Sequence, residues 1–167
     1  MRTLVLGGIR SGKSRWAESA LDPQSVVRYI ATGATGGDDA EWQRRIADHR
    51  RRRPPAWITV ESVDVAGHLR RDPITPTIVD DVGGWLTAAL ERCAWQGRID
   101  ADVGALVAAV RDAADLVLVS PEVGLTVVPA TEAGRRFADE LGALNQRLAD
   151  SCQHVVLVVA GQPVAVK

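Results

Sequence analysis

The stretch that decides the fold of this chain runs Gly7-Gly8-Ile9-Arg10-Ser11-Gly12-Lys13-Ser14. It fits the phosphate-loop pattern G-x-x-x-x-G-K-[ST], with a strand-like run before it and an amphipathic helix pattern after it. Glycines let backbone N–H groups curl around phosphate oxygens, the lysine reaches the β- and γ-phosphates, and the last serine can bind Mg²⁺. Residues 7–14, here called the phosphate loop, are therefore predicted to bind ATP or GTP, with Lys13 catalytic and Ser14 a metal ligand.

Lysine usage makes this match more specific. Of the 20 lysine and arginine residues, only Lys13 and Lys167 are lysines. Arginine is the usual cation of this sequence, but its planar guanidinium does not replace the compact ammonium that the motif needs. One of only two lysines therefore stands where a phosphate loop requires it.

A phosphate loop works with a carboxylate near its magnesium, at the end of a neighbouring strand. The apolar run 77–79 leads directly into Asp80 and Asp81. Asp80 continues the strand and is the predicted Mg²⁺-side carboxylate, with Asp81 as the alternative. A helix N-cap or a strand-end turn is the plain structural alternative for these residues. Residues 80–83 also fit the D-x-x-G motif of regulatory GTPases, but no N-K-x-D motif follows. A signalling GTPase is therefore not expected.

The composition matches an ordinary soluble domain. The chain has 167 residues, 46% hydrophobic and 25% charged, with a net charge of −1. A chain of this length can bury a sufficient core without disulfides or a structural metal. Residues 1–167 are therefore expected to form one nucleotide-binding domain. The near-zero net charge argues against a general surface for nucleic acid.

The two cysteines, Cys93 and Cys152, are too few for a disulfide framework or a four-ligand zinc site. Free thiols suit a reducing compartment. No apolar run is long enough to span a membrane, and the first residues lead into a strand-like run and not into a signal peptide. A cytoplasmic protein without a membrane span is expected.

Short runs rich in valine, isoleucine and leucine alternate with segments of helical period, which predicts an α/β fold with a mainly parallel sheet. Strands are predicted at residues 3–6, 26–31, 57–60, 77–79, 115–119, 154–159 and 164–166. Helices are predicted at residues 13–20, 39–50, 65–70, 85–94, 101–113 and 131–151. Only residues 160–163, which include Gly161-Gln162-Pro163, separate the last two strands. They are therefore expected to form an antiparallel hairpin at a sheet edge.

A run of arginines surrounds one histidine. Residues 44–53 contain six arginines together with His49. Clustered arginines repel one another unless anions are present, although a solvated charged face is the plain alternative. Because the chain already carries a phosphate loop, a second phosphate-binding element is the favoured interpretation. The positive neighbours favour a neutral imidazole, so His49 is a candidate nucleophile toward phosphorus.

Several blocks of the sequence, taken in order, are recognisable. They are Gly7-Gly8-x-Arg10-Ser11-Gly12-Lys13-Ser14-Arg15, Tyr29-Ile30-Ala31-Thr32, Arg45-Ile46-x-x-His49-Arg50-x-x-Arg53-Pro54, Trp57-x-Thr59-x-Glu61, Glu122-Val123-Gly124 with Val128-Pro129, and Asn145-Gln146-Arg147-Leu148-Ala149. From residue 3 to residue 167, the chain resembles the bifunctional adenosylcobinamide kinase and adenosylcobinamide-phosphate guanylyltransferase family of cobalamin biosynthesis.

This resemblance implies a RecA-like P-loop NTPase fold, a homotrimer and two reactions on one chain. In the first, a nucleoside triphosphate phosphorylates the aminopropanol hydroxyl of adenosylcobinamide. In the second, a histidine takes GMP from GTP with loss of pyrophosphate and passes it to adenosylcobinamide-phosphate, which gives adenosylcobinamide-GDP. Five tryptophans with no second domain to cover them slightly favour the trimer.

The resemblance also assigns site residues. The guanylylated histidine falls on His49, and Asp80 with Ser14 is the expected Mg²⁺ pair. Nucleotide-binding positions fall on the phosphate loop and on Ala31, Thr32, Gly33, Arg50, Arg51, Arg52, Arg53, Glu61 and Asp80. Two places depart from the family pattern. Asp81-Val82-Gly83-Gly84 stands where a small residue and a threonine are common, and Pro121 stands where an asparagine is common.

The residues alone leave two other functions open. One is a P-loop kinase of another small metabolite that performs no nucleotidyl transfer. The other is a RecA-like ATPase whose arginine run binds nucleic acid, which would make binding sensitive to salt. Neither alternative predicts GMP on the protein, so the fate of GTP separates them from the bifunctional enzyme.

Overall fold

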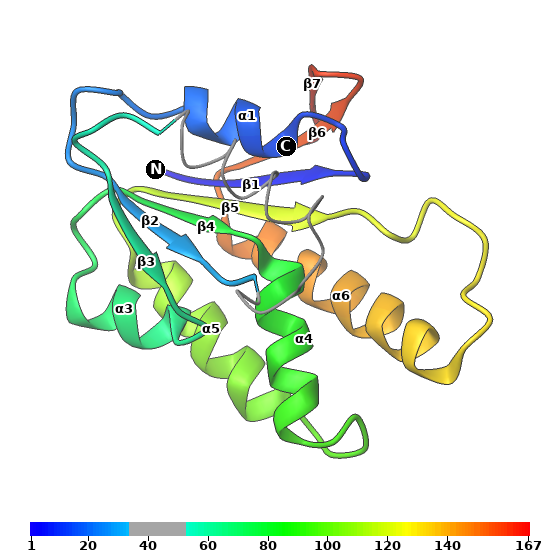
Figure 1. The fold of residues 1–167 in the computed structure, drawn as a ribbon. Coiled ribbons are helices and arrows are strands. Elements are labelled where there is room, and N and C mark those ends of the chain that lie inside the picture. The colour runs from blue at the N-terminus through cyan, green and yellow to red at the C-terminus, as the bar shows by residue number, and fades with distance from the viewer. Residues whose placement is uncertain (34–52) are drawn as a thin grey trace.

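The computed structural model describes residues 1–33 and 53–167. In this part of the chain, seven strands form a sheet in the order β3-β2-β4-β5-β1-β6-β7 (Figure 1). Their bounds are β1 Arg2–Gly7, β2 Arg28–Ala31, β3 Ile58–Glu61, β4 Thr77–Asp80, β5 Leu116–Pro121, β6 His154–Val159 and β7 Gln162–Ala165. Strand β5 separates β1, which leads into the phosphate loop, from β4. The expected α/β fold with a mainly parallel sheet is confirmed.

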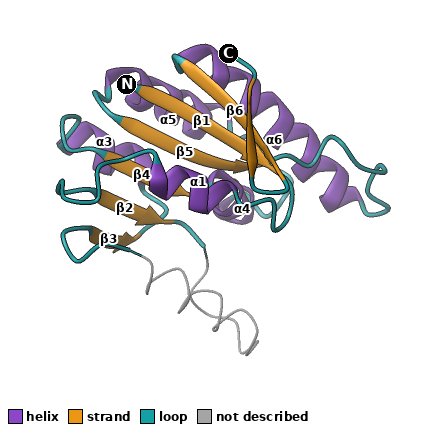
Figure 2. Cartoon of the chain, turned by 90° about the horizontal axis from the view of Figure 1, so that it is seen from above, coloured by secondary structure: helices purple, strands orange, loops and turns teal. Residues whose placement is uncertain are grey.

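Every neighbouring pair of strands is parallel except β6 and β7. Among the helices of the described residues, α1 (Lys13–Ser19) covers one face of the sheet and the other four cover the opposite face (Figures 1 and 2). These four are α3 Val65–Arg71, α4 Val82–Arg92, α5 Asp100–Asp112 and α6 Glu132–Ser151. None of the helices in the described residues is long and apolar enough to cross a membrane.

Alternation along the strands produces two separate cores. Leu4 of β1 packs in the larger core, between the sheet and α3 to α6, whereas its neighbour Val5 packs in the smaller core, between the sheet and α1. Tyr29 and Trp57 also belong to the smaller core. Because successive side chains of a strand point to opposite faces, the continuous apolar runs of the sequence are explained by burial on both faces.

Most predicted elements lie within a few residues of their expected bounds, but α4 begins at Val82 and not at residue 85. The Asp81 side chain accepts a hydrogen bond from the backbone N–H of Gly84 at 2.6 Å and caps the helix. An aspartate at this position satisfies an otherwise unpaired donor and thereby extends the helix to the strand end. The predicted helix 39–50 lies outside the described residues.

The antiparallel C-terminal hairpin is confirmed, but its turn lies earlier than expected. Ala160 and Gly161 form the turn, and both have positive φ angles, of 50° and 78°. Two-residue turns of this conformation match the twist of paired strands. Pro163, expected in the turn, instead pairs with Val158 within β7. Proline is tolerated there because β7 is an edge strand, which needs fewer backbone donors.

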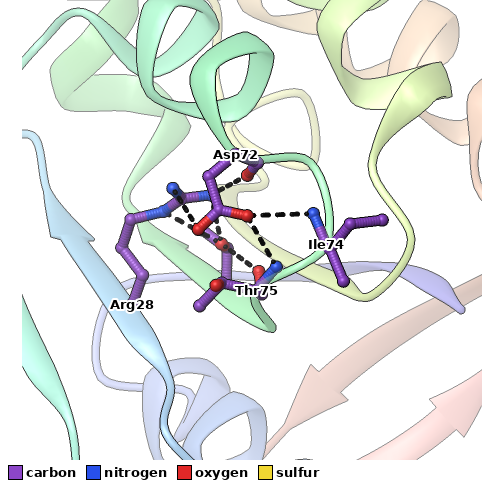
Figure 3. A network of polar contacts seen from close by, with 5 residues as sticks. Arg28, Asp72, Ile74 and Thr75 are labelled. Carbon is purple, nitrogen blue, oxygen red and sulfur yellow. Dashed lines mark hydrogen bonds and ion pairs between the residues drawn. The ribbon is translucent and has the colours of Figure 1, made fainter.

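A polar network fixes the amino ends of β2 and β4, at the edge opposite the carboxyl ends of these strands (Figure 3). The guanidinium of Arg28 donates to the Asp72 carbonyl and to Thr77 Oγ1, each at 2.8 Å. The Asp72 carboxylate accepts from the N–H groups of Ile74 and Thr75. These bonds anchor the turn that leads into β4 and so hold this strand beside β2.

Both cysteines are free thiols, in keeping with the sequence analysis. Cys152 is buried in the larger core. Burial raises the pKa of its thiol to about 11, so this thiol stays protonated near neutral pH. Cys152 therefore packs as a small apolar side chain and not as a nucleophile.

Candidate active site

The carboxyl ends of five parallel strands meet at one edge of the sheet. Gly7 at the end of β1 pairs with Pro121 of β5. Asp80 at the end of β4 pairs with Val119 of β5 on one side and with Ala31 of β2 on the other. Ala31 in turn pairs with Glu61 of β3. The register thus brings predicted site residues from four separate segments to the edge where open α/β sheets bind ligands.

The phosphate loop keeps glycine where a side chain would not fit. A Cβ atom on Gly7 would lie 2.3 Å from Ser11 Oγ and 2.8 Å from the Val158 carbonyl oxygen. Gly12 adopts a φ of 95° and begins α1 without a side-chain cap. The first N–H groups of that helix are therefore left for a ligand. The Lys13 ammonium donates to the Gly8 carbonyl at 3.2 Å, across the loop that the nucleotide phosphates would occupy.

The turn of the C-terminal hairpin supports the phosphate loop from the side. The backbone N–H of Gly161 donates to the Ser11 carbonyl at 2.8 Å. A Cβ atom on Gly12 would lie 3.1 Å from Gly161 Cα, so the two backbones pass closely. The sequence analysis assigned this hairpin only to the sheet edge. Its contact with the loop was missed because no local pattern pairs residue 161 with residue 11.

Of the two candidate carboxylates, Asp80 faces the phosphate loop. The Ser14 hydroxyl donates to Asp80 Oδ1 at 3.3 Å. Asp81, the alternative, caps α4, and burial raises its carboxyl pKa above the usual value. The residues predicted to flank Mg²⁺, Ser14 and Asp80, thus lie together.

These oxygen donors suit Mg²⁺, which prefers hard oxygen ligands and takes the rest of its shell from nucleotide phosphates and water. Among residues 1–33 and 53–167, no group of three or more histidine, cysteine, aspartate or glutamate side chains could hold a metal ion. A site of one hydroxyl and one carboxylate is the smaller donor set that a Mg²⁺–nucleotide complex needs.

Two hydroxyls of the Tyr29-Ile30-Ala31-Thr32 block hold the end of β4. Tyr29 donates its hydroxyl hydrogen bond to Asp80 Oδ2, and Thr32 donates to the Asp81 carbonyl. Burial, followed by the charge of Asp80, raises the pKa of Tyr29 well above its usual value, which keeps the hydroxyl protonated. Thr32 is a predicted nucleotide-binding residue, and its hydrogen bond to the Asp81 carbonyl connects the end of β2 to the end of β4. Gly33 follows it and is exposed.

Arg53 is the described residue of the arginine run. Its guanidinium carbon lies 3.6 Å from the centroid of the Tyr29 ring, and its Nη1 donates to Thr59 Oγ1 at 3.0 Å. His49 and the predicted nucleotide ligands Arg50, Arg51 and Arg52 lie outside the described residues. Their assignment stays a prediction, as does that of Glu61, which is exposed at the end of β3.

Asn145 of α6 anchors the end of β5. Its Oδ1 accepts from the Ser120 hydroxyl at 2.6 Å, and its Nδ2 donates to the Pro121 carbonyl at 3.2 Å. Next along the chain, the N–H of Glu122 donates to the Gly7 carbonyl at 3.0 Å. Asn145 thus connects α6 to the strand end that borders the phosphate loop. The sequence analysis included Asn145 in a family block but gave it no role.

The two departures from the family pattern meet in space. A Cβ atom on Gly83 would lie 2.8 Å from Cγ and 3.2 Å from Cδ of Pro121. The proline ring occupies the volume that a larger residue at position 83 would fill. We therefore interpret the two departures as one packing arrangement beside the strand-end acids.

Comparisons with known proteins agree along the whole chain. Residues 3–166 match the family described as cobinamide kinase / cobinamide phosphate guanyltransferase. The bifunctional adenosylcobalamin biosynthesis protein CobP of Pseudomonas aeruginosa is 43% identical over 172 residues, covering 100% of this chain and 98% of the relative. The bifunctional adenosylcobalamin biosynthesis protein CobU of Escherichia coli is 37% identical over 188 residues, covering 100% of both. A solved structure of the P4 protein from bacteriophage phi6 in complex with ADP has a TM-score of 0.40 and 14% identity, over 98% of this chain and 53% of that one.

We predict that Gly83→Ala destabilises the protein by about 1–3 kcal/mol, because the new methyl group overpacks against Pro121. Helix propensity alone would make the alanine variant more stable by about 1 kcal/mol. A loss of stability would therefore indicate overpacking, and a gain would indicate that the methyl group fits. The matched control is Gly104→Ala in α5, where an added Cβ atom would meet nothing within 4 Å and stability should rise. Urea unfolding measures both.

The same substitution in a Pro121→Ala background should cost less, since the atoms in conflict are gone. The double-mutant cycle then gives a coupling of about 0.5 kcal/mol or more. Additive effects of the two substitutions would contradict the proposed packing arrangement.

Proposed function

The chain belongs to the cobinamide kinase / cobinamide phosphate guanyltransferase family, and on this premise we propose how its own residues divide the two activities. It is a bifunctional enzyme of adenosylcobalamin biosynthesis. Membership of this family favours the bifunctional enzyme over the main alternative from the sequence, a P-loop kinase of another small metabolite. The observation that supports a triphosphate site in this chain is the contact of Ser14 Oγ with Asp80 Oδ1 beside the phosphate loop.

In the kinase reaction, the hydroxyl oxygen of adenosylcobinamide bonds to the γ-phosphorus of ATP or GTP while the bond from this phosphorus to the bridging oxygen breaks. The nucleoside diphosphate leaves and the hydroxyl proton is released. We assign the N–H groups of the phosphate loop to the phosphate oxygens. Lys13 would exchange its bond to the Gly8 carbonyl for the β- and γ-phosphates. Ser14 and Asp80 would hold Mg²⁺, which neutralises charge on those phosphates when bound. Ala31, Thr32, Gly33 and Glu61 lie along the same sheet edge and complete the proposed nucleotide site.

Lys13→Ala should lower kinase turnover by about 100-fold or more, because it removes a charge that stabilises the transition state. The fold should be retained, since the lysine head group bonds only a loop carbonyl among the described residues. Steady-state kinetics with adenosylcobinamide, with circular dichroism as the folding control, test this. Turnover like that of the wild type would contradict the assignment.

For guanylyl transfer, we propose that His49 attacks the α-phosphorus of GTP. A P–N bond forms while the bond to the β-phosphate breaks, and pyrophosphate leaves. An oxygen of adenosylcobinamide-phosphate then takes the GMP and frees the imidazole. Arg50, Arg51, Arg52 and Arg53 would bind the phosphates during this step. The support is the family resemblance and the placement of this histidine within the arginine run.

His49→Asn should abolish covalent GMP labelling and guanylyl transfer but keep substantial kinase activity, because the phosphate loop is untouched. Protein is incubated with GTP labelled at the α-phosphate, and the modified peptide is mapped. The label should be lost in acid and survive base, as a phosphoramidate does. His154→Asn is the matched control, since His154 is exposed at the start of β6. Label on another residue, or undiminished labelling in the mutant, would end the assignment of His49.

We also propose a homotrimer that binds both corrinoid substrates, with no nucleic-acid partner. The described tryptophans give this no support, because each is buried or half-buried within its own chain. Better support comes from Leu125, Val127 and Val128, which are 81%, 87% and 73% exposed in the loop after β5. A cytoplasmic location is proposed from the free thiols.

Light scattering at micromolar concentration should return the mass of three chains of 17.9 kDa each. Replacing Leu125 and Val127 together by serine should shift the protein toward smaller species, because it removes exposed apolar surface without touching either core. A monomer mass for the wild-type protein would remove the trimer from the proposal.

A further inference from the structure

Tyr29 has no role in the reactions described so far, although it contacts the predicted metal carboxylate. It is the only tyrosine of the chain and is completely buried in the smaller core. Its ring stacks on Trp57, with 6.3 Å between centroids and 29° between planes, and the Arg53 guanidinium covers it. Aromatic and cationic groups thus hold the ring at a fixed place. The hydroxyl of such a ring needs a polar partner.

That partner is one specific oxygen of Asp80. Tyr29 donates to Oδ2, whereas Ser14 donates to Oδ1. The strand register explains why Tyr29 reaches Asp80. Tyr29 pairs with Ile78 and Ala31 pairs with Asp80, so Tyr29 lies two residues before the partner of Asp80 and on the same face of the sheet. The two carboxylate oxygens thus accept hydrogen bonds from two different side chains. The plane of the carboxylate is therefore fixed with Oδ1 toward the phosphate loop.

We propose that Tyr29 is a positioning residue that orients the Asp80 carboxylate for Mg²⁺ in the nucleotide complex. The inference rests on the proposed Mg²⁺ role of Ser14 and Asp80. A carboxylate held by a rigid hydrogen-bond donor loses less side-chain freedom on binding a cation, and such supporting donors commonly change metal affinity by about 10–100-fold. Phenylalanine would keep the stack with Trp57 and the platform for Arg53 but leave Oδ2 without this donor.

The test compares the binding of a fluorescent, non-hydrolysable GTP analogue with Mg²⁺ and with EDTA. For Tyr29→Phe we expect affinity in EDTA within about twofold of the wild type, and a Mg²⁺-dependent gain in affinity about tenfold smaller. Trp57→Phe is the matched control, because it alters the same aromatic stack without removing a bond to Asp80, and it should keep the full gain. Thermal unfolding checks that all variants are folded.

The variant Asp80→Asn distinguishes the proposed Mg²⁺ site from the proposed positioning role of Tyr29. It should lose the Mg²⁺-dependent gain, and Tyr29→Phe should add little in that background. If Asp80→Asn lacks the gain while Tyr29→Phe keeps it in full, the inference about Tyr29 is overturned and the Mg²⁺ site stands. If Asp80→Asn keeps the full gain, both the site and the inference fall.

A second measurement needs no substitution at Tyr29. Because the chain has a single tyrosine, protein labelled with ¹³C at tyrosine Cζ gives one resonance. Adding Mg²⁺ to the complex with the GTP analogue should move this resonance in the wild type and leave it in place in Asp80→Asn. A resonance that Mg²⁺ does not move in the wild type would overturn the positioning role.

Discussion

The contact between the Ser14 hydroxyl and the Asp80 carboxylate depends on the parallel alignment of strands that are far apart in the sequence. Strands β1 and β4 do not pair with each other, because β5 lies between them in the sheet. The register of β5 against both strands sets how far each extends at the site edge. A shift of one residue in the β4–β5 pairing would move Asp80 to the opposite face of the sheet, away from α1, and a shift in the β1–β5 pairing would displace the start of the phosphate loop. The chemistry of the site thus depends on two strand registers.

Polar groups at this edge are satisfied by residues that also hold the strands together. Tyr29 and Thr32 of the β2 segment bond the last residue of β4 and the one after it, and Asn145 bonds the last two residues of β5. Unpaired polar groups at a buried edge would cost stability. Because side chains from neighbouring elements bond these polar groups, the edge of the sheet is also rigid. A rigid edge can bind phosphate and metal without rearranging its residues.

Features with a local sequence signal were predicted well. The turn of the phosphate loop between β1 and α1, the position of Asp80 beside Ser14, and the antiparallel hairpin all follow from motifs or short spacings. Features that depend on distant contacts were not. Three contacts join residues that share no local pattern in the sequence. They are the hydrogen bond of Tyr29 to Asp80, the hydrogen bond of Gly161 to Ser11, and the packing of Gly83 against Pro121. The late start predicted for α4 has a simpler cause, since Asp81 was weighed as a metal ligand and is the helix cap.

The most direct test of this organisation is a crystal structure of the protein with a non-hydrolysable GTP analogue and Mn²⁺ in place of Mg²⁺. The anomalous signal of manganese locates the metal independently of the surrounding atoms. We expect a peak beside the β- and γ-phosphates, within direct or single-water contact of both Ser14 Oγ and Asp80, with Tyr29 still bonded to the other carboxylate oxygen. A metal held by Asp81 or Glu61, with Asp80 outside that range, would contradict the assignment of the site.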